Sequence, residues 1–178
     1  MLAVCLENGA LSVRQRARPR RPEGFALIRL LFGGICNTDL ELKRGYYGFR
    51  GTPGHEFVGE VVEADDRRWI GERVVGDINL ACGNCAWCAR GLGRHCPTRK
   101  VLGIVKQPGA FREFLTLPER NSSSRRSRVA SVTGSRKGMI ESSSSSSASR
   151  TLCALGSVKA ILQIAALVTI SNLSQYHP

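Results

Sequence analysis

The chain has 178 residues, enough for one ordinary domain or for a smaller domain with an appendage. A hydrophobic content of 42% is typical of a folded protein, although only 6% of the residues are aromatic. The formal net charge of +12 raises the question of a nucleic-acid partner. However, the excess of basic residues lies in Arg14–Arg21 and after residue 120, without interleaved aromatic residues or a nucleic-acid-binding motif, so we expect no nucleic-acid partner.

The first residues, Met1–Gly9, have no basic start, no long apolar run and no small-residue cleavage site, so they do not resemble a secretory signal. We therefore expect a cytoplasmic, reducing location. In such a compartment the seven cysteines are better interpreted as metal ligands than as disulfides.

The region 1–118 is predicted to be one mainly β domain. Short apolar or Val-rich runs, bounded by glycine and acidic residues, are typical of strands. The predicted strands are Phe25–Phe32, His55–Glu63, Glu72–Asp77 and Ala110–Leu117, the last with Phe111, Leu115 and Leu117 on one face. Short strands, many glycines and one dominant loop indicate a small, irregular β-barrel.

One short helix is predicted at Asn37–Lys43, with Asn37 or Thr38 as its capping residue. Cys36 precedes this helix and follows a strand. A helix N-terminus lowers the pKa of a thiol and so favours the metal-binding thiolate. His55 stands at the start of the next predicted strand. Taken alone, each residue is also compatible with a structural role, the cysteine in packing and the histidine in a turn.

Four cysteines form a much more specific pattern, C-x2-C-x2-C-x7-C, at Cys82, Cys85, Cys88 and Cys96. Four thiolates satisfy tetrahedral zinc without an open position, which is typical of a structural site. An iron–sulfur cluster is the alternative, since it also uses four thiolates. His95 is interpreted as a solvated loop residue, and Cys5 and Cys153 as small apolar residues.

Beyond Pro118 the composition changes. Residues 121–178 contain 16 serines, and the Ser/Arg-rich segment 119–151 has no hydrophobic periodicity, so it is predicted to be disordered. The apolar stretch 152–170 is a helix candidate, followed by a tail at 171–178. A Lys near the centre of a membrane span costs about 2.5–3.5 kcal/mol. Because of Lys159 we favour a buried or partner-seeking helix over a membrane anchor, and expect no membrane partner.

Taken in order, the motifs resemble those of a known family. Gly-x-Cys-x-Thr-Asp at residues 34–39 precedes Gly-His-Glu-x-x-Gly at 54–59, the four-cysteine loop, and Gly-Ala-Phe-x-Glu-Phe at 109–114. This series, from residue 33 to 118, resembles the N-terminal domain of zinc-dependent medium-chain dehydrogenases/reductases, the zinc-containing alcohol dehydrogenase family. Alcohol, polyol and threonine dehydrogenases belong to that family.

The resemblance implies a GroES-like β-barrel and two zinc sites. Cys36 and His55 would be ligands of the catalytic zinc, and Glu56 an adjacent ligand or a carboxylate behind the ligands. Thr38 would relay the proton of the substrate, and Asp39 would orient the loop. The four cysteines would hold structural zinc. In the family, zinc acts as a Lewis acid on an alcohol or carbonyl oxygen, while NAD or NADP exchanges hydride with the substrate.

The sequence departs from the family after about residue 120. The later candidates for a third catalytic-zinc ligand, Glu141, Cys153 and His177, have no matching context, so that site is expected to be incomplete. The Rossmann domain and its G-x-G-x-x-G fingerprint are missing, so neither NAD nor NADP is expected to bind. The switch in composition is typical of a frameshift, a retained intron or a mispredicted gene model.

Two functions follow from these observations. The first is an alcohol or polyol dehydrogenase, truncated after its catalytic domain and inactive as an isolated chain, whose intact relatives act on a small alcohol or carbonyl compound. The second is a non-enzymatic zinc-binding module, or a gene-model fragment. The third zinc ligand and the glycine-rich loop distinguish the two, and both are missing from the recognisable motifs.

Overall fold

A computed structural model of the chain describes residues 1–124. The ten strands are β1 (Leu2–Glu7), β2 (Ala10–Gln15), β3 (Phe25–Gly34), β4 (Glu56–Glu63), β5 (Arg73–Gly76), β6 (Asn79–Leu80), β7 (Lys100–Leu102), β8 (Lys106–Gln107), β9 (Phe114–Pro118) and β10 (Ser122–Ser124). The helices are α1 (Asn37–Lys43) and α2 (Ala86–Ala89), with 3₁₀ turns at Tyr46–Gly48, Arg67–Trp69, Gly93–His95 and Glu119–Asn121.

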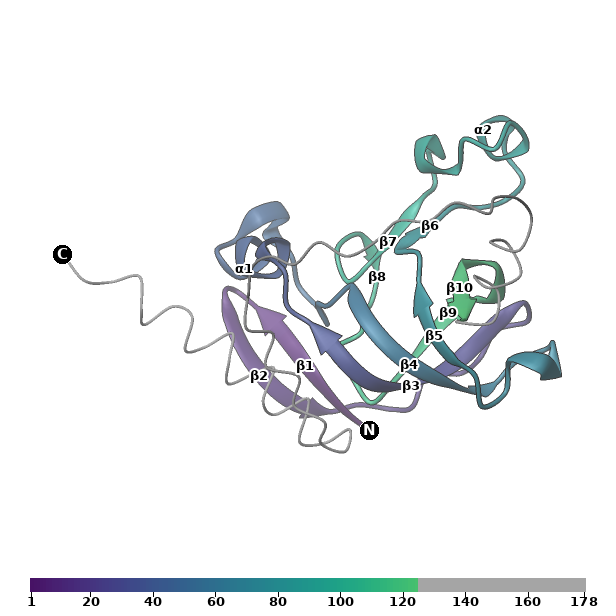
Figure 1. Cartoon of the computed structure of the whole chain (residues 1–178). Helices are drawn as coiled ribbons and strands as arrows, with labels where there is room; N and C mark the ends of the chain where they lie inside the picture. The colour runs from purple at the N-terminus through teal and green to yellow at the C-terminus, as the bar shows by residue number, and fades with distance from the viewer. Residues whose placement is uncertain (125–178) are drawn as a thin grey trace, which may run out of the picture.

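A five-stranded antiparallel sheet, in the order β10-β5-β4-β3-β9, forms the body of the molecule. It curls into the half-barrel visible in Figure 1. The central strand is β3, whose apolar run suits a strand with neighbours on both sides. Register shifts between β3 and β4 bend the pair. The prediction of a mainly β, GroES-like irregular barrel is confirmed, and the sheet forms half of such a barrel.

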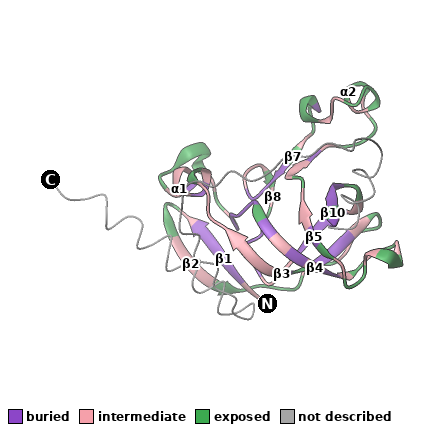
Figure 2. Ribbon diagram, in the orientation of Figure 1, coloured by how far each residue is buried: buried purple, intermediate pink, exposed green. Residues whose placement is uncertain are grey.

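The core lies inside this curl, and Figure 2 shows its buried residues along β1, β3, β4 and β9. The strand predicted at Ala110–Leu117 is β9, which begins only at Phe114; Leu115 and Leu117 in it are fully buried, and so is Phe111 before it. The predicted strands at 25–32, 55–63 and 72–77 match β3, β4 and β5 to within two residues at each end. The hydrophobic pattern therefore located the strands that build the core.

The β1–β2 hairpin, which was not predicted from the sequence, packs along the side of the half-barrel (Figure 1). Its two-residue turn is Asn8-Gly9, with positive φ at both residues. This conformation and this dipeptide are typical of a type I′ turn. Bridges between Ala3 and Arg112 and between Leu6 and Gly51 join β1 to the rest of the domain.

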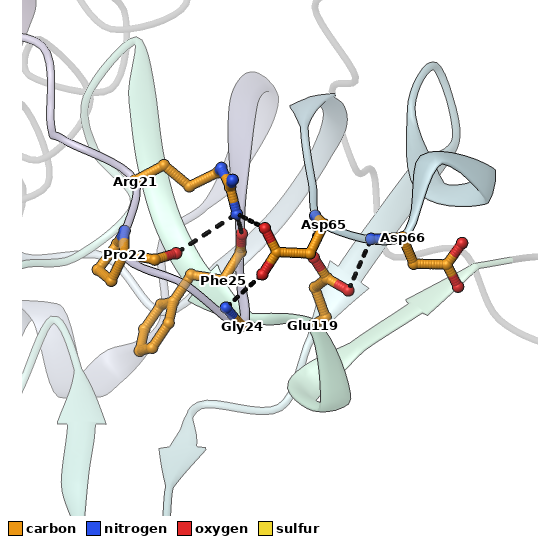
Figure 3. Close-up of polar contacts among 7 residues, drawn as sticks. All are labelled: Arg21, Pro22, Gly24, Phe25, Asp65, Asp66 and Glu119. Atoms are coloured by element: carbon orange, nitrogen blue, oxygen red, sulfur yellow. Dashed lines mark hydrogen bonds and ion pairs between the residues drawn. The ribbon is translucent and has the colours of Figure 1, made fainter.

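A polar network closes the end of the sheet where β4 leaves it (Figure 3). The Asp65 carboxylate accepts hydrogen bonds from the Gly24 N–H and the Arg21 guanidinium, both at 2.5 Å. These contacts lower the pKa of Asp65. The Glu119 carboxylate in turn accepts from the backbone N–H groups of Asp65 and Asp66. The segment before β3, the turn after β4 and the residues after β9 are thereby held together.

The described structure continues past the predicted domain end at residue 118. The Asn121 side chain donates to the backbone carbonyls of Asp77 and Asn79, and β10 pairs with β5. Residues 119–124, which the sequence analysis assigned to a disordered segment, thus form a 3₁₀ turn and a strand in the structure. The rest of that segment, the helix candidate at 152–170 and the tail at 171–178 lie outside the described residues. Within residues 1–124, no helix has the length and apolar character needed to cross a membrane.

Candidate metal centres

The four predicted cysteine ligands come together on a loop that projects from the sheet beside β6 and β7 (Figure 1). We call residues 81–100 the cysteine lobe. The four sulfur atoms all lie within 4.8 Å of one another. The Cys88 sulfur is 3.5 Å from that of Cys85 and 3.9 Å from that of Cys82. Ligands 2.3 Å from a tetrahedral zinc would lie about 3.8 Å apart, so the spacing fits that metal.

Backbone N–H groups point at these sulfur atoms and so prepare the lobe for thiolates. The Gly83 N–H donates to Cys88 and the Cys82 N–H to Cys96. The Asn84 N–H lowers the pKa of the Cys82 thiol to about 6. For Cys88, the Gly83 N–H is outweighed by burial and the neighbouring thiols, which raise its pKa to about 11. A divalent cation would relieve this crowding of thiolates, which is the physical case for a metal in the lobe.

The second group lies where β3 runs into α1 and where β4 begins. The Cys36 sulfur is 2.9 Å from Nε2 of His55. Tetrahedral zinc would hold a sulfur and a nitrogen ligand about 3.5 Å apart, so metal uptake requires the pair to separate slightly. Cys36 is the N-cap of α1, and its sulfur accepts a hydrogen bond from the Thr38 N–H at 3.3 Å. The helix at Asn37–Lys43 is confirmed, but the prediction that Asn37 or Thr38 caps it was wrong.

Asp39 joins this second group, and its contact with His55 was not part of the sequence prediction. The Asp39 carboxylate is 3% exposed and accepts from the N–H groups of Cys36 at 3.0 Å and of Gly54 at 3.1 Å. It also lies 3.5 Å from Nδ1 of His55, an otherwise unpartnered nitrogen. Asp39 and Cys36 thus lie on opposite sides of the His55 ring, Asp39 next to Nδ1 and the Cys36 sulfur next to Nε2. The position of Asp39 suits the role of orienting the two ligands, rather than that of a third ligand.

The charges of this group are coupled. The neighbouring Asp39 carboxylate raises the pKa of His55 to about 9 against the opposing effect of burial, and Cys36 contributes to the increase. Burial acts to raise the pKa of Cys36, but hydrogen bonds from Thr38 and His55 outweigh it, and the net pKa is lowered. Without metal, His55 is therefore favoured in its protonated form at neutral pH, and binding a cation at Nε2 must displace that proton.

The remaining predicted residues are placed differently. The Thr38 hydroxyl hydrogen-bonds to the Cys36 sulfur, beside the Cys36–His55 contact. Glu56 is exposed, and one of its carboxylate oxygens occupies the space beside Gly34 that a Cβ atom would need. Glu56 does not join the Cys36–Asp39–His55 group. Its role as an adjacent ligand therefore stays a prediction.

The predicted third-ligand candidates Glu141, Cys153 and His177 lie outside the described residues. Within residues 1–124, His95 is exposed, as expected of a loop residue, and its ring lies 5.7 Å from that of Trp87. Cys5 is buried in β1, which suits its interpretation as a small apolar residue.

We expect an Asp39→Asn variant to be destabilised by about 1–3 kcal/mol, because the new amide group would face an N–H donor that it cannot satisfy. We also expect it to bind metal at Cys36 and His55 about 10–100-fold more weakly. Urea unfolding and metal titration measure the two effects. The matched control is Glu41→Gln on the same helix, which removes only the surface pair with Arg44. Equal effects of the two substitutions would contradict the positioning role of Asp39.

Comparison with curated proteins finds dehydrogenases of polyols and of L-threonine. The D-altritol 5-dehydrogenase of Agrobacterium fabrum is 42% identical over 99 residues, which cover 52% of this chain and 29% of that protein. The erythritol/L-threitol dehydrogenase of Mycolicibacterium smegmatis is 37% identical over 134 residues, covering 65% and 37%. The chain therefore spans about a third of the length of these relatives.

Among solved structures, the chain is also similar to alcohol dehydrogenases. The alcohol dehydrogenase rspB of Escherichia coli CFT073, complexed with NADH, superposes with a TM-score of 0.65 at 30% identity, covering 70% of this chain and 38% of that one. The cobalt- and zinc-bound alcohol dehydrogenase of Pyrobaculum aerophilum does so with a TM-score of 0.62 at 28% identity, covering 71% and 41%.

The alcohol dehydrogenase GroES-like domain matches residues 22–125, which is more than half of the chain. This match covers the Cys36–His55 pair, the cysteine lobe and the sheet that carries both. It agrees with the resemblance seen in the motifs. The chain therefore belongs to the family of zinc-dependent medium-chain alcohol dehydrogenases, through their N-terminal GroES-like domain.

Proposed function

We propose that residues 1–124 form the zinc-binding catalytic domain of an NAD(P)-linked dehydrogenase that acts on an alcohol or polyol. The observation that carries this proposal is the Cys36–His55 pair with Asp39 behind it, in a domain of this family. Zinc bound there would supply Lewis acidity toward an alcohol or carbonyl oxygen. The polyol and L-threonine dehydrogenases among the relatives support a small hydroxyl compound, such as a polyol, as the substrate class.

The residues around the pair have separate tasks in this proposal. Cys36 and His55 bind the metal through Sγ and Nε2, the two atoms that face each other. Asp39 orients both ligands, because it accepts from the Cys36 N–H and lies beside Nδ1 of His55. Thr38, whose hydroxyl is next to the sulfur, would accept the proton of the substrate hydroxyl and pass it toward solvent.

We further propose that a protein of these 178 residues does not complete the reaction alone. Hydride transfer needs a bound nicotinamide, and the sequence contains no G-x-G-x-x-G fingerprint. The cysteine lobe would hold structural zinc. The Cys36–His55 site would bind metal more weakly, because it offers two protein ligands where zinc sites in proteins have three or four. The thiol ligands are compatible with the expected cytoplasmic location.

The alternative is a non-enzymatic zinc-binding module. The closed four-cysteine lobe favours it, because such a site has no open position for a substrate. The alternative does not require any metal at Cys36, whereas the dehydrogenase proposal does. Metal binding at that cysteine therefore separates the two functions.

Cobalt substitution tests the proposal directly, because a thiolate ligand gives cobalt a visible absorption band. We expect one tightly bound cobalt per chain and a second, weaker one that a chelator removes first. A Cys36→Ser variant should lose the second ion and keep the first. If Cys36→Ser leaves both cobalt content and spectrum unchanged, Cys36 is not a ligand and the dehydrogenase proposal fails.

Activity gives the complementary test. The 178-residue chain, mixed with NAD or NADP and with altritol, erythritol or threitol, is expected to show no turnover above a zinc-only blank. The same domain, exchanged for its counterpart in the Mycolicibacterium smegmatis enzyme, should support turnover that Cys36→Ser abolishes. Turnover by the 178-residue chain would contradict its proposed dependence on a separate nicotinamide-binding domain.

A further inference from the structure

The cysteine lobe is strongly basic, although the excess of positive charge was expected only in Arg14–Arg21 and after residue 120, and its proposed metal site does not explain this charge. Between Asp77 and Glu113 the sequence contains no acidic residue. The lobe itself, residues 81–100, carries four basic side chains that are exposed or half-buried: Arg90, Arg94, Arg99 and Lys100. Such a concentration of one charge sign produces a positive potential over a small projecting surface.

The basic side chains of the lobe have no acidic partners among residues 1–124. Among residues 1–124, six arginines outside the lobe form ion pairs: Arg14, Arg18, Arg21, Arg29, Arg44 and Arg68. In the same part of the chain, no basic side chain of the lobe is paired with a carboxylate. No carboxylate of residues 1–124 thus neutralises the positive charge of the lobe.

An aromatic residue lies within this basic surface. Trp87 in α2 is 44% exposed, one of four large hydrophobic residues on the surface of the described chain. The Arg90 guanidinium lies 5.7 Å from the centre of the Trp87 ring system, and the His95 ring lies 5.7 Å away. Figure 2 shows the α2 loop exposed and projecting from the sheet. Exposed Trp and Arg side chains are among those that contribute most to the binding energy of protein–protein interfaces.

We propose that the cysteine lobe is a docking surface for an acidic segment of a partner protein. Carboxylates of that segment would bind the guanidinium groups of Arg90 and Arg94, which suit bidentate pairing. An apolar side chain of the segment would pack on Trp87. This proposal is independent of whether the Cys36–His55 site performs catalysis.

A nucleic acid is the other polyanion to consider, and the lobe suits it less well. Proteins that bind single strands stack successive bases on several aromatic side chains along a basic groove. The lobe offers one large aromatic side chain, Trp87, with Arg90 and His95 beside it. The combination of one apolar anchor with several guanidinium groups therefore favours a polypeptide.

The test uses the full chain loaded with zinc and a fluorescein-labelled peptide rich in glutamate with a few leucines. Fluorescence anisotropy at low salt is expected to show binding that falls steeply as salt increases. A double variant, Arg90→Glu with Arg94→Glu, should bind about tenfold more weakly or worse. A Trp87→Ala variant should also bind more weakly, without any change in charge.

The matched control is Arg20→Glu with Arg50→Glu, which makes the same change of net charge on exposed residues outside the lobe. Zinc content per chain, measured for each variant, verifies that the lobe is intact. The proposal is overturned by equal weakening in both double variants, by no binding of the glutamate-rich peptide, or by equal binding of a glutamine-rich peptide. Tighter binding of a single-stranded oligothymidine would also overturn it, in favour of nucleic acid.

Discussion

A Cys82→Ser variant is expected to lose its tightly bound metal ion and to unfold the cysteine lobe. Structural zinc contributes on the order of 10–16 kcal/mol of apparent binding free energy in small zinc-folded peptides. The lobe contains little else to hold it, since α2 has four residues and the lobe's surface is mostly exposed. Local order at residues 81–100 therefore depends on the four sulfur atoms remaining together.

Two measurements monitor the loss of metal and of local order in the Cys82→Ser variant. Metal analysis should show about one zinc fewer per chain. Limited trypsin digestion should cleave after Arg90, Arg94 and Arg99 at least about tenfold faster, because exposed, unfolded arginine sites are the preferred sites of nicking. The control is Cys5→Ala, which removes a thiol buried in β1, away from both metal groups. Unchanged zinc content in Cys82→Ser would contradict the assignment of the lobe.

The second large effect is expected at Gly54, next to His55. Gly54 has φ +97°, and a Cβ atom there would meet the Phe111 ring at 2.5 Å. A Gly54→Ala change would add left-handed backbone strain to a steric clash with the core, for a total of about 2–5 kcal/mol. Because the Gly54 N–H also donates to Asp39, the shift should disturb His55 and weaken metal binding there.

Gly45→Ala is the control that separates the two costs. Gly45 has a similar φ of +104°, but a Cβ atom there meets nothing within 4 Å. Urea unfolding should therefore show a loss of about 1–2 kcal/mol, from backbone strain alone, and unchanged metal affinity. If the two variants lost equal stability, the contact of Gly54 with Phe111 would not limit the size of that residue.

The strands that form the core were predictable because their hydrophobic runs are local signals. The continuous apolar run of β3 indicates a strand with two neighbours whatever the rest of the chain does. The hairpin β1–β2 could have been predicted from Asn8-Gly9, which is a strong turn signal between two strand-like runs. In contrast, β6, β8 and β10 have only two or three residues each, and they are strands because distant segments pair with them.

The candidate sites also differ in whether a local sequence signal predicts them. The cysteine lobe is visible in the sequence because its four ligands fall within 15 residues at spacings that zinc uses. Cys36 and His55 lie 19 residues apart, and only the resemblance to a family linked them before the structure placed them 2.9 Å apart. Asp39 had a local signal that the sequence analysis did not use, since it stands three residues after Cys36 in the arrangement of a capping box.

The short pairing of β10 with β5 has a consequence for handling the domain in the laboratory. A recombinant fragment ended at Pro118 would remove β10 and leave β5 as the border of the main sheet, with its N–H and C=O groups unpaired. Unpaired sheet borders recruit strands from other molecules and lead to aggregation. A fragment that extends to Ser124 keeps this border covered by the protein's own chain.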